Sequence, residues 1–155
     1  VPSASRWARE NENLYLIMHR IVIKILADQN IVASTFEGSQ ENKDSFLCFL
    51  RRTTGDVLID GNKIGGSAQR RKKNALLQHG SLLLRQSDNA PELNGIEDLV
   101  GFEIDETDLI ANWISLLGHE MGISFSEERM SDYEVQVVNK VNKDFYALEN
   151  WSTRR

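Results

Sequence analysis

The stretch Lys63-Ile64-Gly65-Gly66-Ser67-Ala68-Gln69-Arg70-Arg71, followed by Gln78-His79-Gly80-Ser81, is the part of the sequence that decides the fold. Before it stands Ile59-Asp60-Gly61-Asn62, which predicts a hairpin turn because Asp-Gly and Gly-Asn pairs accept the positive φ angles of tight turns. The two adjacent glycines lack Cβ atoms at a predicted bend, so backbone N–H groups and the lysine ammonium can converge on a carbonyl or phosphate oxygen. The spacing is neither that of a Walker loop nor that of the dinucleotide-binding fingerprint.

Around this stretch we predict three antiparallel strands, at residues 56–60, 63–69 and 75–84. A shorter strand is expected at residues 31–36. The polar, glycine-containing segment 38–45 that follows it predicts a mobile loop.

Helical periodicity is present on both sides of the predicted sheet. Residues 11–29 are predicted to form an amphipathic helix, and two more helices follow a linker at residues 88–95. The first of these ends at Gly122, a glycine placed as a left-handed terminator, and the second begins with the capping box of Ser131 and Glu134. We expect their apolar stripes to be core; these stripes are Leu109, Ile110, Trp113, Leu117 and Met121 in the first helix and Val135, Val138, Val141 and Phe145 in the second.

The glycine-containing stretch and the segment Leu76 to Leu84 behind it resemble the signature of the lipoate-protein ligase and octanoyltransferase family, which shares its catalytic domain with biotin protein ligases. Two motifs in order, correctly separated and preceded by a strand and turn, make the resemblance specific. It implies an α+β fold, class II synthetase-like, with a mixed or antiparallel sheet flanked by helices. The substrate-binding residues that it implies are Gly65, Gly66, Ser67, Ala68, Gln69, His79 and Gly80.

Cys48 is the only cysteine of the chain and stands fifteen positions before Lys63. In the cysteine-dependent octanoyltransferases of the family, a Cys-Phe pair at this separation from the strand lysine carries the acyl group as a thioester, so the resemblance implies that Cys48 and Lys63 are catalytic. A neighbouring ammonium lowers the pKa of a thiol and favours the nucleophilic thiolate. The alternative is that Cys48, flanked by Leu47 and Phe49, is a small buried hydrophobic residue.

The chain departs from the family in two ways. Family members place an Arg-Arg-x-Thr-Gly-Gly motif and several strands before the region that corresponds to Val1, so we expect residues 1–155 to be a single, incomplete domain that corresponds to the C-terminal two-thirds of the family's domain. Asp56 resembles the acid of the Asn-Asp pair of the ligases, but Gly55 replaces the asparagine. This replacement weakens the case for a ligase that uses ATP.

Composition sets wider limits. The 155 residues include 41% hydrophobic and 26% charged residues, which is typical of a soluble globular domain. No apolar stretch is long enough to span a membrane, and a single cysteine favours the reducing cytoplasm. Metals are not expected, because His19, His79 and His119 lie on different predicted elements. We expect His79 to bond backbone and hold the Lys63 loop rather than to act in chemistry.

Arg70-Arg71-Lys72-Lys73 is a basic run in a chain of net charge −5. It predicts either a solvated hairpin tip or a docking site, and the lack of interleaved aromatic residues disfavours nucleic acid. The family resemblance implies acidic partners: acyl carrier protein as donor, and as acceptor the lipoyl domains of 2-oxoacid dehydrogenases or the glycine-cleavage H protein. A local positive patch can steer such partners without a basic isoelectric point.

These observations predict transfer of an octanoyl or lipoyl group to a lysine of a lipoyl domain through a Cys48 thioester, a reaction that requires no cofactor. One alternative is a lipoate-protein ligase that uses ATP and magnesium to form an acyl-adenylate and retains Lys63. Another is a non-catalytic fragment that binds carrier domains through the basic run.

Overall fold

The computed structural model describes residues 1–2, 5, 11–40, 48–148 and 151. The chain divides into two compact units, Val1–Ile123 and Ser124–Arg155. Each unit is described by itself below.

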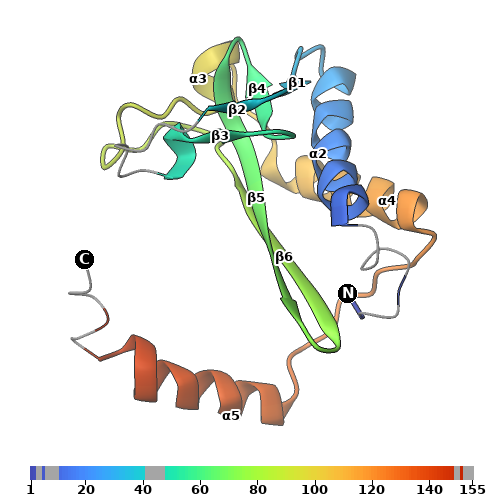
Figure 1. Cartoon of the computed structure of the whole chain (residues 1–155), viewed down its shortest axis with the longest axis vertical. Coiled ribbons are helices and arrows are strands. Elements are labelled where there is room, and N and C mark those ends of the chain that lie inside the picture. The colour runs from blue at the N-terminus through green and yellow to red at the C-terminus, as the bar shows by residue number, and fades with distance from the viewer. Residues whose placement is uncertain (3–4, 6–10, 41–47, 149–150, 152–155) are drawn as a thin grey trace. The chain divides into compact units, whose positions relative to one another are not determined.

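The first unit is built on a four-stranded antiparallel sheet with the strand order β1-β4-β5-β6. Its strands are β1 (Ser34–Thr35), β4 (Val57–Ile59), β5 (Asn62–Lys72) and β6 (Ala75–Leu82). The three predicted antiparallel strands are therefore confirmed, and the two longest form the hairpin that dominates Figure 1. The strand expected at residues 31–36 is only two residues long.

The predicted turn before β5 is confirmed by the backbone. Asp60 and Gly61 form the loop of the β4–β5 hairpin with φ angles of 46° and 76°. The expected bend at Gly65 and Gly66 is not a turn, because β5 continues through both glycines, but the pairing of β5 with β4 shifts register between Lys63 and Gly65.

Close packing explains why glycine stands at two of the motif positions. A Cβ atom on Gly80 would lie 2.6 Å from the carbonyl oxygen of Gly66 on the paired strand. A Cβ atom on Gly66 would lie 2.7 Å from Cε of Lys63 and 2.9 Å from Oδ1 of Asp56. All three distances are too short for real contacts, so these glycines allow backbone and side chains to approach each other.

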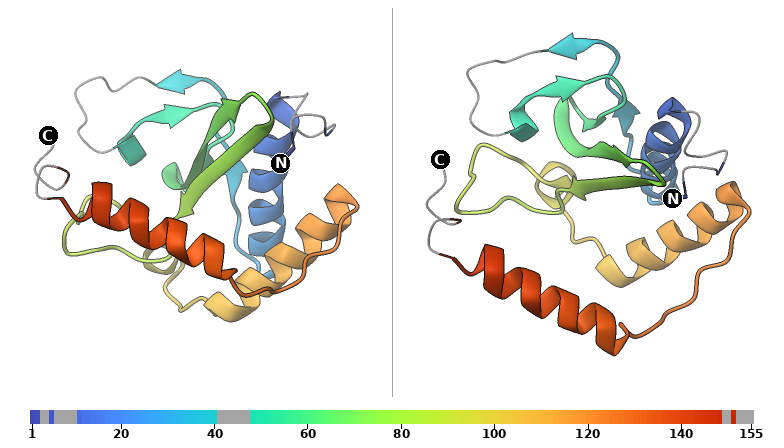
Figure 2. Two further views of the ribbon diagram at one scale, coloured as in Figure 1. Left: turned by 90° about the horizontal axis from the view of Figure 1, so that it is seen from below. Right: turned by 60° about the horizontal axis from the view of Figure 1, so that its bottom comes forward.

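Helices cover one side of the β5–β6 hairpin. They are α2 (Asn11–Asp28), α3 (Ile96–Val100) and α4 (Glu106–Met121). Figure 2 shows α2 and α4 on one side of the hairpin, whereas the short pair β2 (Ser39–Gln40) and β3 (Arg52–Thr53) lies on the other. The predicted helix at 11–29 is confirmed, as is the left-handed Gly122 that ends α4 with φ 64°. The loop expected at 38–45 is wrong in its first part, where β2 pairs with β3, and residues 41–47 lie outside the described residues.

Two apolar clusters form the core of the first unit. One joins α2 to α4 and β6, and the other joins the end of α2 to the sheet, α3 and the segment before α4. Their buried members are Leu14, Ile21, Ile25, Leu76, Leu117 and Met121 in the first, and Leu26, Ile31, Val57, Ile59, Ile64, Ile96 and Ile104 in the second. Among the residues that the structure describes, none of the helices has the length and apolar character needed to cross a membrane.

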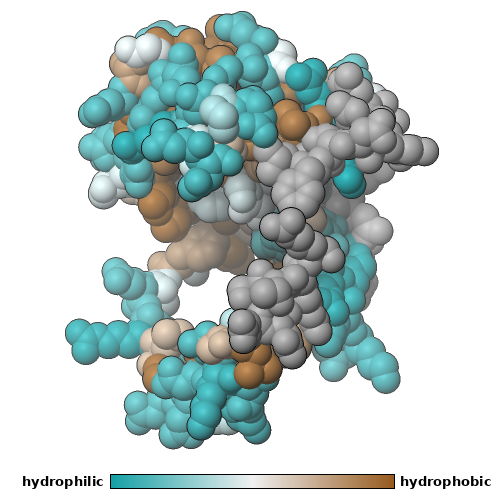
Figure 3. Space-filling model, turned by 90° about the vertical axis from the view of Figure 1, so that its left-hand side faces the viewer, coloured by the Kyte–Doolittle hydropathy of each residue, from teal (hydrophilic) through white to brown (hydrophobic). Residues whose placement is uncertain are grey.

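The second unit contains α5 (Asp132–Val141) and a π-helical turn η2 (Asn142–Tyr146). The predicted capping box is confirmed, because the Ser131 side chain accepts from the Glu134 N–H and the Glu134 carboxylate accepts from the Ser131 N–H. Figure 3 shows hydrophobic side chains along one side of α5 and hydrophilic ones along the other. Within this unit, none of the residues of the α5 stripe is buried. The described residues of the unit form a single helix and one turn, which provide no second layer over the stripe.

Candidate active site

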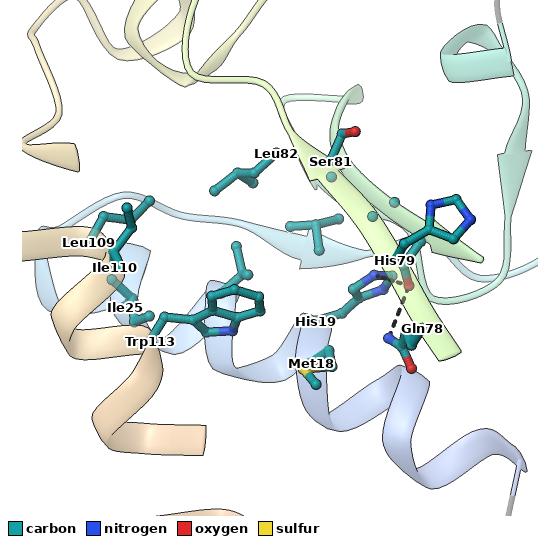
Figure 4. A pocket seen from close by; sticks show the side chains of 16 residues that line it. Met18, His19, Ile25, Gln78, His79, Ser81, Leu82, Leu109, Ile110 and Trp113 are labelled. Atoms are coloured by element: carbon teal, nitrogen blue, oxygen red, sulfur yellow. Dashed lines mark hydrogen bonds between the residues drawn. The ribbon is translucent and has the colours of Figure 1, made fainter. Parts of the chain in front are cut away.

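An apolar cavity of about 280 Å³ lies between the β5–β6 hairpin and helices α2 and α4. Figure 4 shows Trp113, Ile110 and Leu109 reaching it from α4, opposite Leu82 of β6. The sequence predicted Ile110 and Trp113 to be core, but they are 52% and 38% exposed. These two side chains are better described as one wall of the cavity. Its volume is close to the lower end of the range of about 300–1,000 Å³ for small-molecule sites.

A buried ion pair stands behind this cavity. Nζ of Lys63 lies 2.8 Å from Oδ2 of Asp56, and the two side chains are 11% and 2% exposed. The same ammonium donates to the carbonyl oxygen of Arg51 at 2.9 Å and lies 5.1 Å from the ring centroid of Phe49. The Lys63 side chain is therefore held in one place by Asp56, which directly precedes β4, and by groups on the segment that precedes β3.

Asp56 has further partners that keep its charge satisfied. Its carboxylate accepts hydrogen bonds from the Thr53 N–H at 2.8 Å, from the Thr53 hydroxyl at 3.3 Å and from the Tyr15 hydroxyl at 3.2 Å. Burial raises the pKa of the Tyr15 phenol, and the negative charge of Asp56 also raises it. Tyr15 thus stays a neutral hydrogen-bond donor at neutral pH.

A second polar network connects α2 to the hairpin. His19 is 5% exposed, and its Nδ1 lies 2.6 Å from the Gly55 carbonyl oxygen. Its Nε2 lies 3.0 Å from Oγ of Ser67, which also accepts a hydrogen bond from Nε2 of Gln78 at 3.1 Å. Both contacts of Ser67 are the dashed lines of Figure 4. Burial lowers the pKa of His19, which favours the neutral imidazole.

Ser67 also borders a second depression, of about 400 Å³, on the surface. Tyr15, Thr53, Ala68 and Gln69 line this depression together with Ser67. The Ser67 hydroxyl is therefore placed where the apolar cavity and the more open depression meet.

The structure brings most of the predicted substrate-binding residues together. Gly65, Gly66 and Ser67 lie on β5 opposite Leu82, Ser81 and Gly80 of β6, and all of them line the apolar cavity. Ala68 and Gln69 line the surface depression instead.

Lys63 and His79 differ from the rest of the predicted set. Lys63 lines neither hollow, since its ammonium is engaged by Asp56. His79 borders the cavity, but its ring points away from Trp113 in Figure 4, and within the described part of the chain its side chain makes no hydrogen bond. The histidine that bonds backbone is His19.

Cys48 is the first residue of the 3-10 helix η1 (Cys48–Leu50), which packs against β5. The structure describes the backbone of Cys48 but not the position of its thiol. Phe49 and Arg51, which follow it closely in the sequence, both contact the Lys63 ammonium. The backbone of the predicted nucleophile is thus near the predicted activating lysine.

Sequence reasoning missed four polar members of this site. Thr53 and Tyr15 gave no pattern that could be recognised, and Gln78 was recognised only as part of a motif and not as a partner of Ser67. His19 did leave a signal, since it interrupts the longest apolar stretch of the chain, and a buried polar side chain requires a partner. In the parts of the chain that the structure describes, no three His, Cys, Asp or Glu side chains gather as a metal site would require.

Solved structures share this arrangement of sheet and helices. A T. acidophilum protein described as a candidate lipoate protein ligase, solved with bound lipoic acid, superposes with a TM-score of 0.72 at 18% identity, covering 97% of this chain and 60% of that one. Lipoate-protein ligase A bound with ATP superposes with a TM-score of 0.69 at 19% identity, covering 92% of this chain and 59% of that one. The predicted fold class, an antiparallel sheet with flanking helices of the lipoate-ligase type, is therefore confirmed.

Sequence comparison then identifies the family. Residues 4–96 match the model of the lipoyl protein ligase A/B catalytic domain, and the chain belongs to this family. Octanoyltransferase LipM of Clostridioides difficile is 32% identical over 138 residues, which cover 76% of this chain and 50% of that protein. Octanoyltransferase LipM of Anoxybacillus flavithermus is 26% identical over 141 residues, covering 74% and 49%. The chain thus spans about half the length of these relatives.

Proposed function

We propose that this chain takes part in protein lipoylation, transferring an octanoyl group to a lysine of a lipoyl domain. Family membership and the similarity to octanoyltransferases support this reaction. The cavity supports it as well, because an apolar hollow that is bordered by a few polar groups suits an acyl chain with a reactive carbonyl at one end.

The observation that carries the proposal is the contact between η1 and Lys63. The Phe49 ring and the Arg51 carbonyl contact the ammonium of Lys63, and Cys48 begins the same helical turn. A thiol near this ammonium would titrate below its ordinary pKa and attack the thioester of an octanoyl donor. Cys48 would then carry the octanoyl group to the acceptor lysine.

The test uses the protein produced from its own coding sequence and octanoyl-loaded acyl carrier protein. Cys48 is expected to gain one octanoyl mass without ATP, and hydroxylamine should remove it. Acylation of a lipoyl domain that requires ATP and survives Cys48→Ser would contradict the thioester route. Lys63→Arg is preferable to Lys63→Ala as a second variant, because loss of the ammonium would leave the Asp56 carboxylate buried without a counterion.

The ATP-dependent ligase is the second candidate function, and it would require a site for magnesium. Asp56 is the carboxylate described at the site, and it already accepts from Lys63, Thr53 and Tyr15. The described residues therefore do not fit this ion, and we derive no step through ATP.

The basic hairpin supports a role for acidic carrier partners such as acyl carrier protein and lipoyl domains. The run Arg70 to Lys73 forms the end of β5 and the first residue of the turn to β6, at the far end of the hairpin, and these side chains are exposed. Reversing Lys72 and Lys73 to Glu should slow association with an acidic carrier domain at low salt and have less effect at high salt. If the unmodified protein and the variant associate at the same rate throughout a salt series, carrier domains do not dock at this hairpin tip. A non-catalytic carrier-binding protein would use the same surface, so this result would exclude that alternative as well.

A further inference from the structure

The Ser67–His19 pair has a geometry that suits proton transfer rather than support of the fold alone. The Gly55 carbonyl oxygen can only accept, so the His19 Nδ1 that lies 2.6 Å away must carry a hydrogen. In the neutral ring the other nitrogen, Nε2, is then an acceptor. The Ser67 hydroxyl, 3.0 Å from Nε2, therefore donates its proton to His19.

Within the described residues, the Ser67 hydroxyl has one hydrogen-bonding position without a partner. A hydroxyl has one donor hydrogen and accepts two hydrogen bonds. His19 takes the hydrogen, and Nε2 of Gln78 occupies one of the two acceptor positions. Gln78 is itself held by Nε2 of Gln69 at 2.9 Å. One lone pair of Ser67 is thus available to an N–H donor that enters from the cavity or from the surface depression, which both border this residue.

We propose that Ser67 and His19 form a proton relay that deprotonates the acceptor amine during acyl transfer, an inference that rests on the proposed function. An acceptor lysine arrives as an ammonium, with an ordinary pKa near 10.4, and cannot attack a carbonyl until it loses a proton. Lys63 cannot accept that proton, because its own ammonium is paired with Asp56 and has donors only. Ser67 contacts the substrate, and His19 acts through Ser67.

One N–H of the ammonium transfers its proton to Oγ of Ser67 while the Ser67 proton moves to Nε2 of His19, giving a free amine and an imidazolium. The amine nitrogen attacks the carbonyl carbon of the acyl thioester, the C–N bond forms and the C–S bond breaks. The second amine proton goes to the departing thiolate, and His19 later returns its proton to solvent through Ser67.

The surroundings of His19 allow it to act as a base. Burial lowers its pKa, so the imidazole is neutral and able to accept at neutral pH. Asp56 raises the pKa and Lys63 lowers it, and these are the charged groups that influence His19 from the sheet. The Tyr15 ring, 4.3 Å from the His19 ring between centroids, is the titratable neighbour on its own helix.

The test compares two amines that differ only in whether they need a base. The protein from its own coding sequence is given an octanoyl thioester with either a lipoyl-domain lysine or hydroxylamine, which is already unprotonated at pH 7. Ser67→Ala and His19→Gln should slow transfer to lysine by about 10²–10⁴-fold and should slow transfer to hydroxylamine far less. His119→Gln, which removes an exposed histidine of α4, is the matched control and should change neither rate.

A pH series provides the second measurement. Without the relay, transfer depends on the fraction of free lysine, so the Ser67→Ala rate should rise about tenfold per pH unit between about pH 7 and 9, whereas the unmodified protein should show a flatter profile. Equal slowing of both amines, or the same pH slope in both proteins, would overturn the relay while leaving acyl transfer in place. If the unmodified protein acylates neither amine, the proposed function is wrong and the relay fails with it.

Discussion

Helices α2 and α5 carry the same kind of apolar stripe, yet only α2 buries it. Leu14, Ile21 and Ile25 of α2 are 1%, 3% and 2% exposed, whereas Val135 and Val138 of α5 are 39% and 52% exposed. The sheet and α4 cover α2, while the described residues of the unit that contains α5 form no second layer. Periodicity thus identifies which side of a helix is apolar, and the presence of another layer decides whether that side contributes to stability.

The same contrast holds for the charged groups, and it predicts the largest effect. Asp56 is 1% exposed, pairs with the Lys63 ammonium and accepts hydrogen bonds from Thr53 and Tyr15. Asp56→Ala should lower the free energy of unfolding by about 3–5 kcal/mol, because it leaves the Lys63 ammonium nearly buried and unpaired. Urea denaturation measures this loss. Glu134→Ala in α5 is the control, since Glu134 is fully exposed and its removal should not shift the unfolding of the first unit. If Asp56→Ala lowers the free energy of unfolding by less than about 1 kcal/mol, the Lys63–Asp56 ion pair stabilises the fold no more than an exposed surface ion pair does.

Deleting apolar side chains tests the comparison directly. Leu26 is 0% exposed at the end of α2, and Leu26→Ala should destabilise by about 2–5 kcal/mol through lost burial and the cavity left behind. Val138→Ala, at the 52% exposed position of α5, should change stability by less than about 0.5 kcal/mol. Denaturant midpoints of both variants provide the measurement. A Val138→Ala effect as large as that of Leu26→Ala would mean that the α5 stripe is covered in solution.

Glycines of the hairpin allow a narrower test within the first unit. A Cβ on Gly80 would lie 2.6 Å from the Gly66 carbonyl oxygen, so Gly80→Ala should destabilise by about 1–3 kcal/mol as the strands separate. Gly65→Ala is the matched variant, because its Cβ would meet side-chain carbons no closer than 3.4 Å. Thermal unfolding of the two variants should therefore differ. Equal melting temperatures would show that the hairpin relaxes at no cost.

Features specified within a few residues could be predicted from the sequence. The Asp60–Gly61 turn, the left-handed Gly122 and the Ser131–Glu134 capping box all depend on neighbours in the chain, and all three were correct. The predicted bend at Gly65 and Gly66 is only a register shift within a continuous strand, and the need for glycine at position 66 comes from the Asp56–Lys63 pair. Only the folded chain shows that need.

The candidate site shows the same difference between features that the local sequence specifies and features that depend on tertiary packing. The motif positions of β5 and β6 were predicted to lie together, and strand register makes them neighbours. Ser67 and His19 are 48 positions apart, and their hydrogen bond depends on how α2 packs against the sheet. Packing of this kind leaves no local pattern, so the pair could not be predicted, even though a histidine inside an apolar helix face indicated an unknown partner.

The smallest predicted effect concerns α5, where capping rather than packing supports the helix. Ser131→Ala removes the hydroxyl that accepts from the Glu134 N–H and should cost α5 about 1 kcal/mol, lowering the helicity of residues 132–141 in NMR chemical shifts. Ser126→Ala, which lies outside the helix and removes only a 3.4 Å contact with Glu128, is the control.

The pH dependence of α5 separates capping from other causes. Hydrogen bonds from the Ser131 hydroxyl and from its N–H lower the pKa of Glu134 below its ordinary 4.5. Because the folded pKa is the lower one, this carboxylate's contribution is complete above about 4.5 and is lost as the pH falls through the lowered value. The helicity of α5 should therefore fall on acidification, and Ser131→Ala should reduce that fall. The same acid response in both proteins would mean that α5 does not depend on its cap, so that a covering layer would have to stabilise it as the sheet and α4 stabilise α2.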